Sequence, residues 1–406
     1  MKKYILKIIL CTCLAFGSTY GYFGADMNFI DFLVHSNQLS VRTDRFGILA
    51  GTSNVRVAVG ITGANSLSDL IIHNIGDIGG TNGVISLVPS VLAGIGYDAG
   101  FWGIGAGYEF TYKSDSYMVH TPVITATVLD DALRINVPVS IGVGSKSKTT
   151  VADLTGAYVV STAIEARYYF PREMPVLSQL RFFVNYGNAY IENVADNQQY
   201  LRQQSFGLQA RIYFKIETPE VLIEPILRVQ YDQSLATDNK NFGANIINDN
   251  FSISAKGFAP YYPTTGPGSS TGGNGANTGS GLNGGYLASI PGSYYAIEPY
   301  RVGVAVPVGF TATSLDENIS FYLEPALSFT MIGAKHIYQS SASQNERNSI
   351  FGLGYVVYGE LYIRPVKSLE WYFEIQTGGV TIADSLKNPS QTSLVFNGKT
   401  GLSYYF

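Results

Sequence analysis

Residues 133–143 read LRINVPVSIGV, and this stretch decides the fold class. Apolar side chains occupy every second position, and the positions between them include Arg134, Asn136 and Ser140. An alternation with a period of two is typical of a β-strand that has one apolar and one polar face. The stretch is also long enough to cross a lipid bilayer as a tilted strand, which takes about 9–11 residues.

The same alternation recurs along most of the chain. We count fourteen such runs, and a single-chain bacterial barrel needs an even number of strands. The sequence therefore predicts an all-β fold, a closed antiparallel transmembrane β-barrel of about 14 strands. The runs lie near residues 55–63, 83–97, 101–112, 121–129, 132–143, 157–170, 179–190, 205–215, 220–232, 296–310, 318–332, 351–364, 368–377 and 393–406.

The connections between these runs alternate between a short and a mostly long set. Outer-membrane barrels place short turns on the periplasmic side and longer loops outside the cell. We therefore expect a location in a bacterial outer membrane, with the long loops exposed at the cell surface. The longest loop, at 233–295, contains a Gly-, Ser-, Thr- and Asn-rich tract at 264–285. The short connections are 98–100, 130–131, 171–178, 216–219, 311–317 and 365–367; the long ones are 64–82, 113–120, 144–156, 191–204, 233–295, 333–350 and 378–392.

The composition supports a surface that faces lipid. Charged residues are only 14% of the chain, against about 25% in soluble domains, and aromatic residues reach 13%. The formal net charge of −4 gives no indication of nucleic-acid binding. Because no segment after the first residues offers 18 uninterrupted apolar residues, a membrane crossing must use strands, and outer-membrane lipids are the expected surroundings.

Residues 1–21 have the layout of a secretory signal peptide. Lysines precede a short apolar core, and small residues follow it. A membrane-anchoring helix and a lipoprotein signal ending at Cys13 are the less favoured alternatives. Cys11 and Cys13 are the two cysteines of the chain, so we expect a mature protein with neither disulfides nor thiolate metal sites.

Residues 22–54 fit the strand pattern less well. Phe29, Ile30, Phe32 and Leu33 cluster at nearly helical spacing. We therefore expect a short helix, forming an N-terminal periplasmic or plug segment, before a barrel at 55–406. The competing interpretation is a strand at 39–49, which would make the strand number odd.

Charged residues of both signs stand opposite the apolar positions of the strands. A lysine or arginine facing lipid at mid-membrane costs about 2–4 kcal/mol, so these side chains should face the lumen. They either line a polar path for small hydrophilic solutes or form ion pairs that fill the interior, and the mixed signs predict weak charge selectivity. The lumen-facing candidates are Glu109, Arg134, Glu165, Arg167, Arg181, Arg211, Glu224, Arg228, Arg301, Glu324, Glu360, Glu374 and Lys399.

No catalytic or metal-binding constellation stands out. The histidines form no HxxxH or HExxH pair, and GxSxG is absent. The stretch Gly142–Thr149 lacks the glycine before the lysine that a phosphate-binding loop has. Gly103, Gly105 and Gly107 are better explained as small residues facing a crowded lumen. We expect no enzymatic activity, no cofactor and no metal.

The end of the sequence resembles a known signature. Leu402, Tyr404 and Phe406 alternate up to a terminal aromatic residue. This resembles the C-terminal signal that outer-membrane barrels present to the barrel assembly machinery. The resemblance implies that these three residues form the assembly signal.

The segment after the signal peptide resembles the start of the variable surface proteins of spirochaetes. The resemblance implies an abundant, porin-like surface antigen that can form homo-oligomers and meet host surfaces or antibodies. The residues that carry it are Ile30, Asp31, Phe32, Leu33, His35, Asn37, Gln38, Arg42, Asp44, Phe46 and Gly47.

Two functions from different classes follow. The first is a surface-exposed general diffusion porin that is also a surface antigen. The alternative is a barrel with a closed lumen that serves adhesion or surface coating through its extracellular loops. Single-channel conductance distinguishes them.

Overall fold

The computed structural model describes residues 29–43, 45–63, 89–146, 154–192, 200–240, 253–256, 294–297, 299–339, 342–383 and 391–406. The expected signal peptide at 1–21 and the glycine-rich tract at 264–285 lie outside these residues. Within them, no helix is long and apolar enough to cross a membrane. The helical element η1 spans only Phe29–Asp31.

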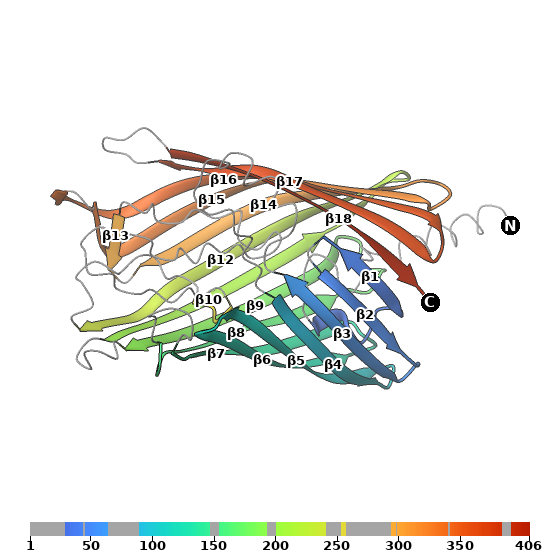
Figure 1. Cartoon of the computed structure of the whole chain (residues 1–406). Helices are drawn as coiled ribbons and strands as arrows, with labels where there is room; N and C mark the ends of the chain where they lie inside the picture. Colours follow the sequence, from blue (N-terminus) through green and yellow to red (C-terminus); the bar gives the residue numbers. More distant parts are fainter. Residues whose placement is uncertain are drawn as a thin grey trace, which may run out of the picture.

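The described strands form one antiparallel sheet that closes on itself, because β1 pairs with both β2 and β18 (Figure 1). Two short strands, β11 and β13, lie beside β12 and β15. The wall is therefore a barrel of sixteen strands. The strands are β1 (Gln38–Arg42), β2 (Arg45–Gly51), β3 (Val55–Gly63), β4 (Pro89–Asp98), β5 (Trp102–Ser114), β6 (Tyr117–Val128), β7 (Leu133–Gly144), β8 (Tyr158–Tyr169), β9 (Leu177–Glu192), β10 (Tyr200–Phe214), β11 (Ile216–Glu217), β12 (Val221–Lys240), β13 (Tyr294–Ile297), β14 (Tyr300–Thr313), β15 (Ile319–Gln339), β16 (Ala342–Val366), β17 (Leu369–Ala383) and β18 (Gln391–Tyr405).

The predicted fold class is confirmed, and the predicted number of strands is too low. Each of the fourteen predicted runs overlaps one strand of the wall. The two additional strands, β1 and β2, lie within residues 22–54, so the barrel begins at Gln38 and not at residue 55, and the expected short helix is η1. The competing strand at 39–49 is in fact a hairpin of two strands, which keeps the total even. These strands have five and seven residues, too few to show a clear alternation.

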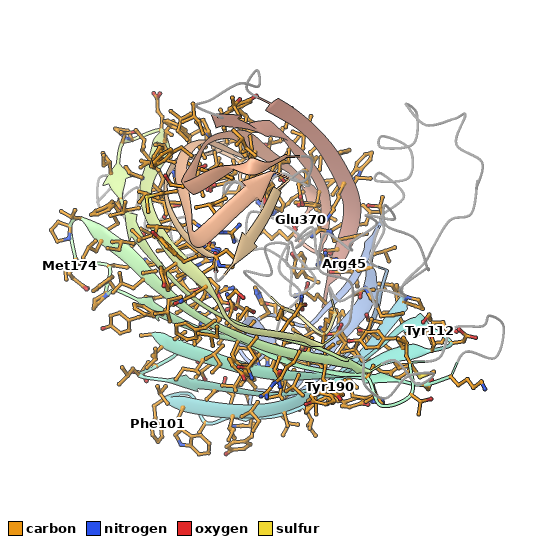
Figure 2. The ribbon with its side chains drawn as sticks, turned by 90° about the vertical axis from the view of Figure 1, so that its left-hand side faces the viewer. Arg45, Phe101, Tyr112, Met174, Tyr190 and Glu370 are labelled. Atoms are coloured by element: carbon orange, nitrogen blue, oxygen red, sulfur yellow. The ribbon has the colours of Figure 1, made fainter. Side chains whose placement is uncertain are left out.

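The two faces of the wall differ in polarity, as the alternation predicts. Along β14, Val304 and Val306 are exposed on the outside, whereas Ala305 between them is buried. In Figure 2, Phe101 and Met174 point away from the barrel, while Glu370 lies inside it. Exposed apolar side chains on the outer face of a transmembrane barrel are the lipid-facing band.

Several predicted loops are instead continuations of strands. β15 runs to Gln339 and β16 resumes at Ala342, within the loop expected at 333–350. The expected connection at 113–120 is a tight turn between Ser114 and Tyr117. β16 has 25 residues, which at about 3.3 Å per residue gives a strand of about 80 Å. Such hairpins extend past a hydrocarbon layer about 30 Å thick and lie at the end opposite the C-terminus (Figure 1).

Candidate functional site

The charged residues predicted to face the lumen lie on the face opposite the lipid-facing side chains, and none of the thirteen is exposed. Arg134, Arg181, Glu224 and Lys399 are partly exposed, and the other nine are buried. The interior of the barrel is thus the candidate site.

The N-terminal helix η1 lies inside the barrel on a bed of glycines. A Cβ atom at Gly105 would overlap the ring of Phe32, and one at Gly107 would overlap the ring of Phe29. Phe29 and Phe32 meet edge to face, with ring centroids 5.7 Å apart. The rings can approach the wall this closely because the strands carry no side chains there. The bed comprises Gly94, Gly96, Gly103, Gly105 and Gly107 of β4 and β5.

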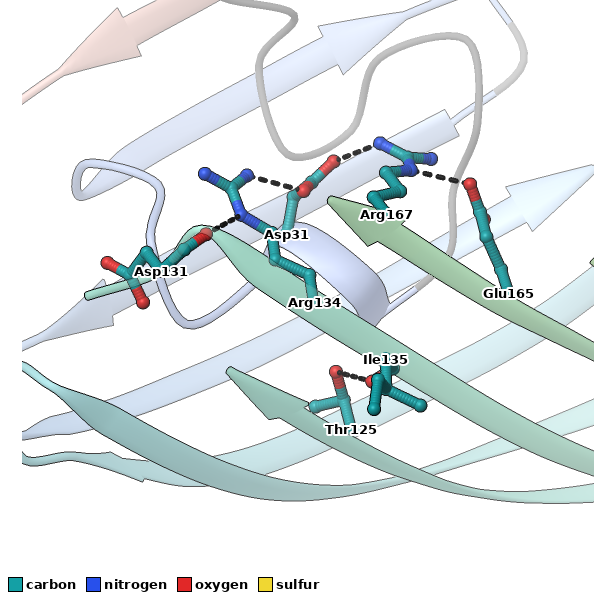
Figure 3. Close-up of polar contacts among 7 residues, drawn as sticks. All are labelled: Asp31, Thr125, Asp131, Arg134, Ile135, Glu165 and Arg167. Carbon is teal, nitrogen blue, oxygen red and sulfur yellow. Dashed lines mark hydrogen bonds and ion pairs between the residues drawn. The ribbon is translucent and has the colours of Figure 1, made fainter. Parts of the chain in front are cut away.

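Asp31 links η1 to strands β7 and β8 of the wall (Figure 3). Arg134 Nη1 donates to Asp31 Oδ1 at 2.7 Å, and Arg167 Nη1 donates to Asp31 Oδ2 at 2.7 Å. Arg167 also donates through Nε to Glu165 at 2.5 Å. One carboxylate therefore bridges arginines of two neighbouring strands, β7 and β8. Asp31 was not among the predicted lumen residues.

Docking shifts the titration of two groups in this segment. Burial by itself raises the pKa of Asp31, but the charges of Arg167, His35 and Arg134 outweigh it and hold the pKa well below the ordinary 3.8. Burial lowers the pKa of His35 from its ordinary 6.5, although the Asp31 carboxylate opposes this shift. Both shifts mean that the docked segment binds fewer protons than the released one in acid.

We predict that acid releases η1. Docking is at full strength above pH 6.5, weakens below that value as released His35 takes up a proton, and weakens again below the ordinary 3.8 of Asp31. The distance between nitroxide labels at Val34 and Ser53, measured at pH 7, 5 and 3, reports the docked fraction. Asp31→Asn should lower the docking free energy by about 1.5–3 kcal/mol, the value of hydrogen bonds to a charged group. A docked fraction that is constant from pH 7 to 3 would contradict this.

A second segment, residues 253–256, also contacts the inner wall. The backbone N–H groups of Ile253 and Ala255 donate to Ser205 Oγ at 2.7 Å and to Ser161 Oγ at 2.9 Å. Tyr117 Oη donates to the Ala255 carbonyl at 3.0 Å. Part of the long connection expected to be an extracellular loop at 233–295 is thus folded inward. It contacts β6, β8 and β10, although the chain enters this connection from β12.

Lys256 ends this segment and forms an ion pair with one predicted lumen residue. Its Nζ lies 2.5 Å from Glu109 Oε2 on β5. The lysine is partly exposed, whereas the carboxylate is largely buried. A residue 147 positions along the chain therefore neutralises Glu109.

Five of the predicted arginines form one row across five neighbouring strands, which we call the arginine row. Directly opposite residues on antiparallel strands point to the same face. The row runs from β7 to β12, and the pairs along it are Arg134 with Arg167, Arg167 with Arg181, Arg181 with Arg211, and Arg211 with Arg228.

Three of the six predicted acids lie on a different arc of the wall, formed by β15–β17, which we call the acid arc. Tyrosine hydroxyls two residues away on the same strand donate to Glu324, Glu360 and Glu374. Arg42 of β1 forms an ion pair with Glu374 at 3.1 Å, and Lys399 is its directly opposite neighbour on β18. The predicted mixture of charges is therefore separated by sign only in part, because Glu109, Glu165 and Glu224 lie on β5, β8 and β12.

One strongly buried ion pair joins β12 to β14. Arg301 donates to Asp232 Oδ2 from Nε at 2.9 Å and from Nη2 at 2.6 Å. Gln230 Nε2 donates to the same oxygen at 2.7 Å, and both charged side chains are at most 8% exposed. Glu224, farther along β12, accepts from Ser178 Oγ at 3.5 Å.

The inner wall is accessible at β8 and β9. Ala163 is exposed although it shares the inward face with the buried Glu165 and Ser161. Its opposite neighbour Asn185 and the nearby Phe183 are partly exposed. Solvent therefore reaches the inside of the barrel at this place.

The three residues of the expected assembly signal lie on the outer face. Leu402, Tyr404 and Phe406 are 47%, 49% and 57% exposed. The rings of Tyr404 and Phe406 stack with centroids 6.3 Å apart. No group of three His, Cys, Asp or Glu side chains within the described residues could hold a metal ion.

A known protein family and several solved structures are similar to this chain. A model of the protein family described as Serpulina hyodysenteriae variable surface protein matches residues 2–405. No curated protein matches the chain. Similar solved structures include a bacterial polysaccharide outer membrane secretin, at 9% identity and a TM-score of 0.45, covering 91% of this chain and 98% of that one. OmpT of Vibrio cholerae, folded in vitro, has 9% identity and a TM-score of 0.33 over 91% and 96% of the two chains. Wzi of Escherichia coli, a carbohydrate-binding β-barrel, has 7% identity and a TM-score of 0.30 over 91% and 84%.

Proposed function

The chain belongs to the family of Serpulina hyodysenteriae variable surface proteins, and from this premise we propose that it is a porin of the bacterial outer membrane with a narrow channel. The family and the fold make it an outer-membrane β-barrel surface protein. The proposal adds passage of small hydrophilic solutes through the barrel.

The observation that carries the proposal is the solvent-accessible inner wall at Ala163. Barrels of 16–18 strands have an interior too wide to be filled by wall side chains alone and leave an aqueous channel. Charged and amide side chains line this interior, which suits hydrated solutes and excludes apolar ones. Water in contact with Ala163 and Asn185 is what such a channel requires.

Two inward segments narrow the path, so general diffusion is replaced by a more restricted passage. η1 occupies the space over the glycine bed of β4 and β5. Residues 253–256 contact the wall at Ser161 and Ser205. Solutes would pass through the space that these segments leave free, which favours small molecules.

We further propose that the tall hairpins face outward and carry the antigenic surface. The short turns and the C-terminus lie at one end of the barrel, and the long hairpins of β15 and β16 lie at the other (Figure 1). Outer-membrane barrels place short turns in the periplasm. Antibodies and host surfaces would then contact the end of the barrel that carries the long hairpins. The barrel assembly machinery would contact the chain earlier, before it inserts into the membrane.

A barrel with a closed lumen is the second candidate. It is supported by the burial of the acid arc, where Glu324, Glu360 and Glu374 are at most 6% exposed. In this case the protein would act as a surface coat or adhesin through its outer end.

Planar-bilayer recording separates these functions. We expect discrete conductance steps from the purified barrel, and larger steps from the double variant Asp31→Ala, Phe32→Ala, because releasing η1 widens the path. Asp316→Ala, in an exposed turn, is the matched control and should conduct like the wild type. Absence of steps from both the wild type and the double variant, with folded protein in the membrane, would overturn the porin and leave the coat protein.

A further inference from the structure

We infer that the arginine row is a binding site for anions that carry phosphate or carboxylate groups. The part of this inference that concerns transport rests on the proposed channel, which would then prefer anionic solutes. The binding itself does not depend on conduction.

The row concentrates positive charge in a way that the fold alone does not require. Like charges directly opposite each other on neighbouring strands are destabilising, and four such pairs follow one another from β7 to β12. The row ends on both sides at uncharged residues, because Arg134 faces Thr127 and Arg228 faces Ala305. Five guanidinium groups thus follow one another along one arc. Asp31 and Glu165 compensate Arg134 and Arg167 at one end, and an anion would relieve the repulsion in the rest of the row.

Arg181, the middle member of the row, forms no ion pair with a carboxylate of the described residues, and Glu165 and Glu224 act on it only from longer range. Among the described residues, the guanidinium of Arg181 lies over the Tyr213 ring, 4.9 Å from its centroid, and no carboxylate is within ion-pair distance. Its Nε atom is buried without a hydrogen-bond partner. Arg211 and Arg228 donate to the neutral amide oxygens of Gln209 and Gln230. Donors of Arg181 therefore stand ready for a ligand.

The structure shows how the row receives an anionic group. At one end, the two oxygens of the Asp31 carboxylate accept from Arg134 and Arg167, each at 2.7 Å. A single carboxylate bridges two adjacent members of the row there. Arg181 and Arg211 are adjacent members in the same register, so a phosphate or carboxylate oxygen pair can bridge them in the same way.

Water reaches the inner wall four residues along the strand from this part of the row. Ala163 lies on β8, next to Arg181's strand, and is exposed on the inward face. Arg181 itself is partly exposed. Guanidinium groups present their donors in a planar fork that matches carboxylate and phosphate oxygens, which explains why arginine rather than lysine suits this position.

The test measures tripolyphosphate binding to the folded barrel in detergent by calorimetry, which needs no conduction. We expect binding by the wild type, and a dissociation constant about tenfold higher for Arg181→Gln, since charge-assisted hydrogen bonds are lost. Arg172→Gln removes the same charge at an exposed turn outside the barrel and should bind like the wild type. Arg181→Lys should lie between Arg181→Gln and the wild type, and it replaces Arg181→Gln if that variant gives no folded, heat-modifiable band.

A second measurement is the reversal potential in a potassium chloride gradient. We expect the wild type to prefer chloride, and Arg181→Gln to shift toward potassium while Arg172→Gln does not. A barrel that binds tripolyphosphate through Arg181 but never conducts would support the site and overturn the porin. Conduction without tripolyphosphate binding, or equal binding by Arg181→Gln and the wild type, would overturn the arginine-row inference and leave the porin standing.

Discussion

Removing residues 401–406 should abolish folding of the barrel altogether. These residues provide every partner of β1 on its β18 side, from Gln38 opposite Tyr405 to Arg42 opposite Gly401. Without them two strand edges would face lipid, where each unsatisfied backbone group costs several kcal/mol. We expect the truncated chain to migrate on a gel at one position before and after heating, whereas the complete protein shows a heat-modifiable folded band.

Deleting residues 38–42 tests whether the truncated chain fails to fold because the barrel cannot close or because the C-terminal assembly signal is missing. This variant also opens the wall, with unpaired edges at β2 and β18 instead of at β1 and the end of β17, but it keeps Leu402, Tyr404 and Phe406 intact. If closure of the barrel is what folding requires, the deletion variant should show no folded band, like the truncated chain. A normal folded band from the 38–42 deletion would show that the loss in the truncated chain comes from the assembly signal instead.

Asp232→Ala should destabilise the folded barrel by about 3–5 kcal/mol, the usual effect of removing one partner from a buried ion pair. The change leaves the Arg301 guanidinium without the oxygen that accepts from its Nε and Nη2. The free energy of unfolding in urea, with the protein in lipid vesicles, measures the effect.

The double variant Asp232→Ala, Arg301→Met provides the control. Removing both charges leaves no uncompensated guanidinium at this position, so much of the lost stability should return. Asp316→Ala, in the exposed turn between β14 and β15, should unfold at nearly the wild-type urea concentration. A double variant as unstable as Asp232→Ala would argue that the carboxylate acts through Gln230 rather than through Arg301.

The strands of the wall could be predicted because period-two alternation is a local property. Leu133 to Val143 carry it completely, and the structure places this run in β7. β1 and β2 were anticipated only as one competing strand at 39–49, because β1 is held by hydrogen bonds to β18, at the far end of the chain, and β2 pairs with β1 and β3. The Ser40 and Ser403 hydroxyls are 2.8 Å apart across a separation of 363 residues. The five residues of β1 carry no local pattern that could identify a partner so far along the chain.

The candidate site was predictable in its residue types and in the face they occupy, but not in its arrangement. The period of two assigns Arg181 and Arg211 to the polar face, yet only the strand register makes them neighbours. Asp31 lies 103 residues from Arg134 and 136 from Arg167, so no spacing rule connects them. The sole local signal for the docked segment was the near-helical spacing of Phe29 and Phe32.

The short wall at β1 has a consequence for the surrounding membrane. Its five residues span about 17 Å even if the strand stands upright, whereas the apolar band of an outer-membrane barrel is about 25 Å tall. β16, which lies beyond β18 and β17 in the wall, has 25 residues and is longer than this band. Hydrophobic mismatch on one side only must be met by local thinning of the bilayer or by a tilt of the barrel axis. The orientation of this protein, and with it the height at which its long hairpins stand above the lipid, should therefore change with the acyl-chain length of the membrane that holds it.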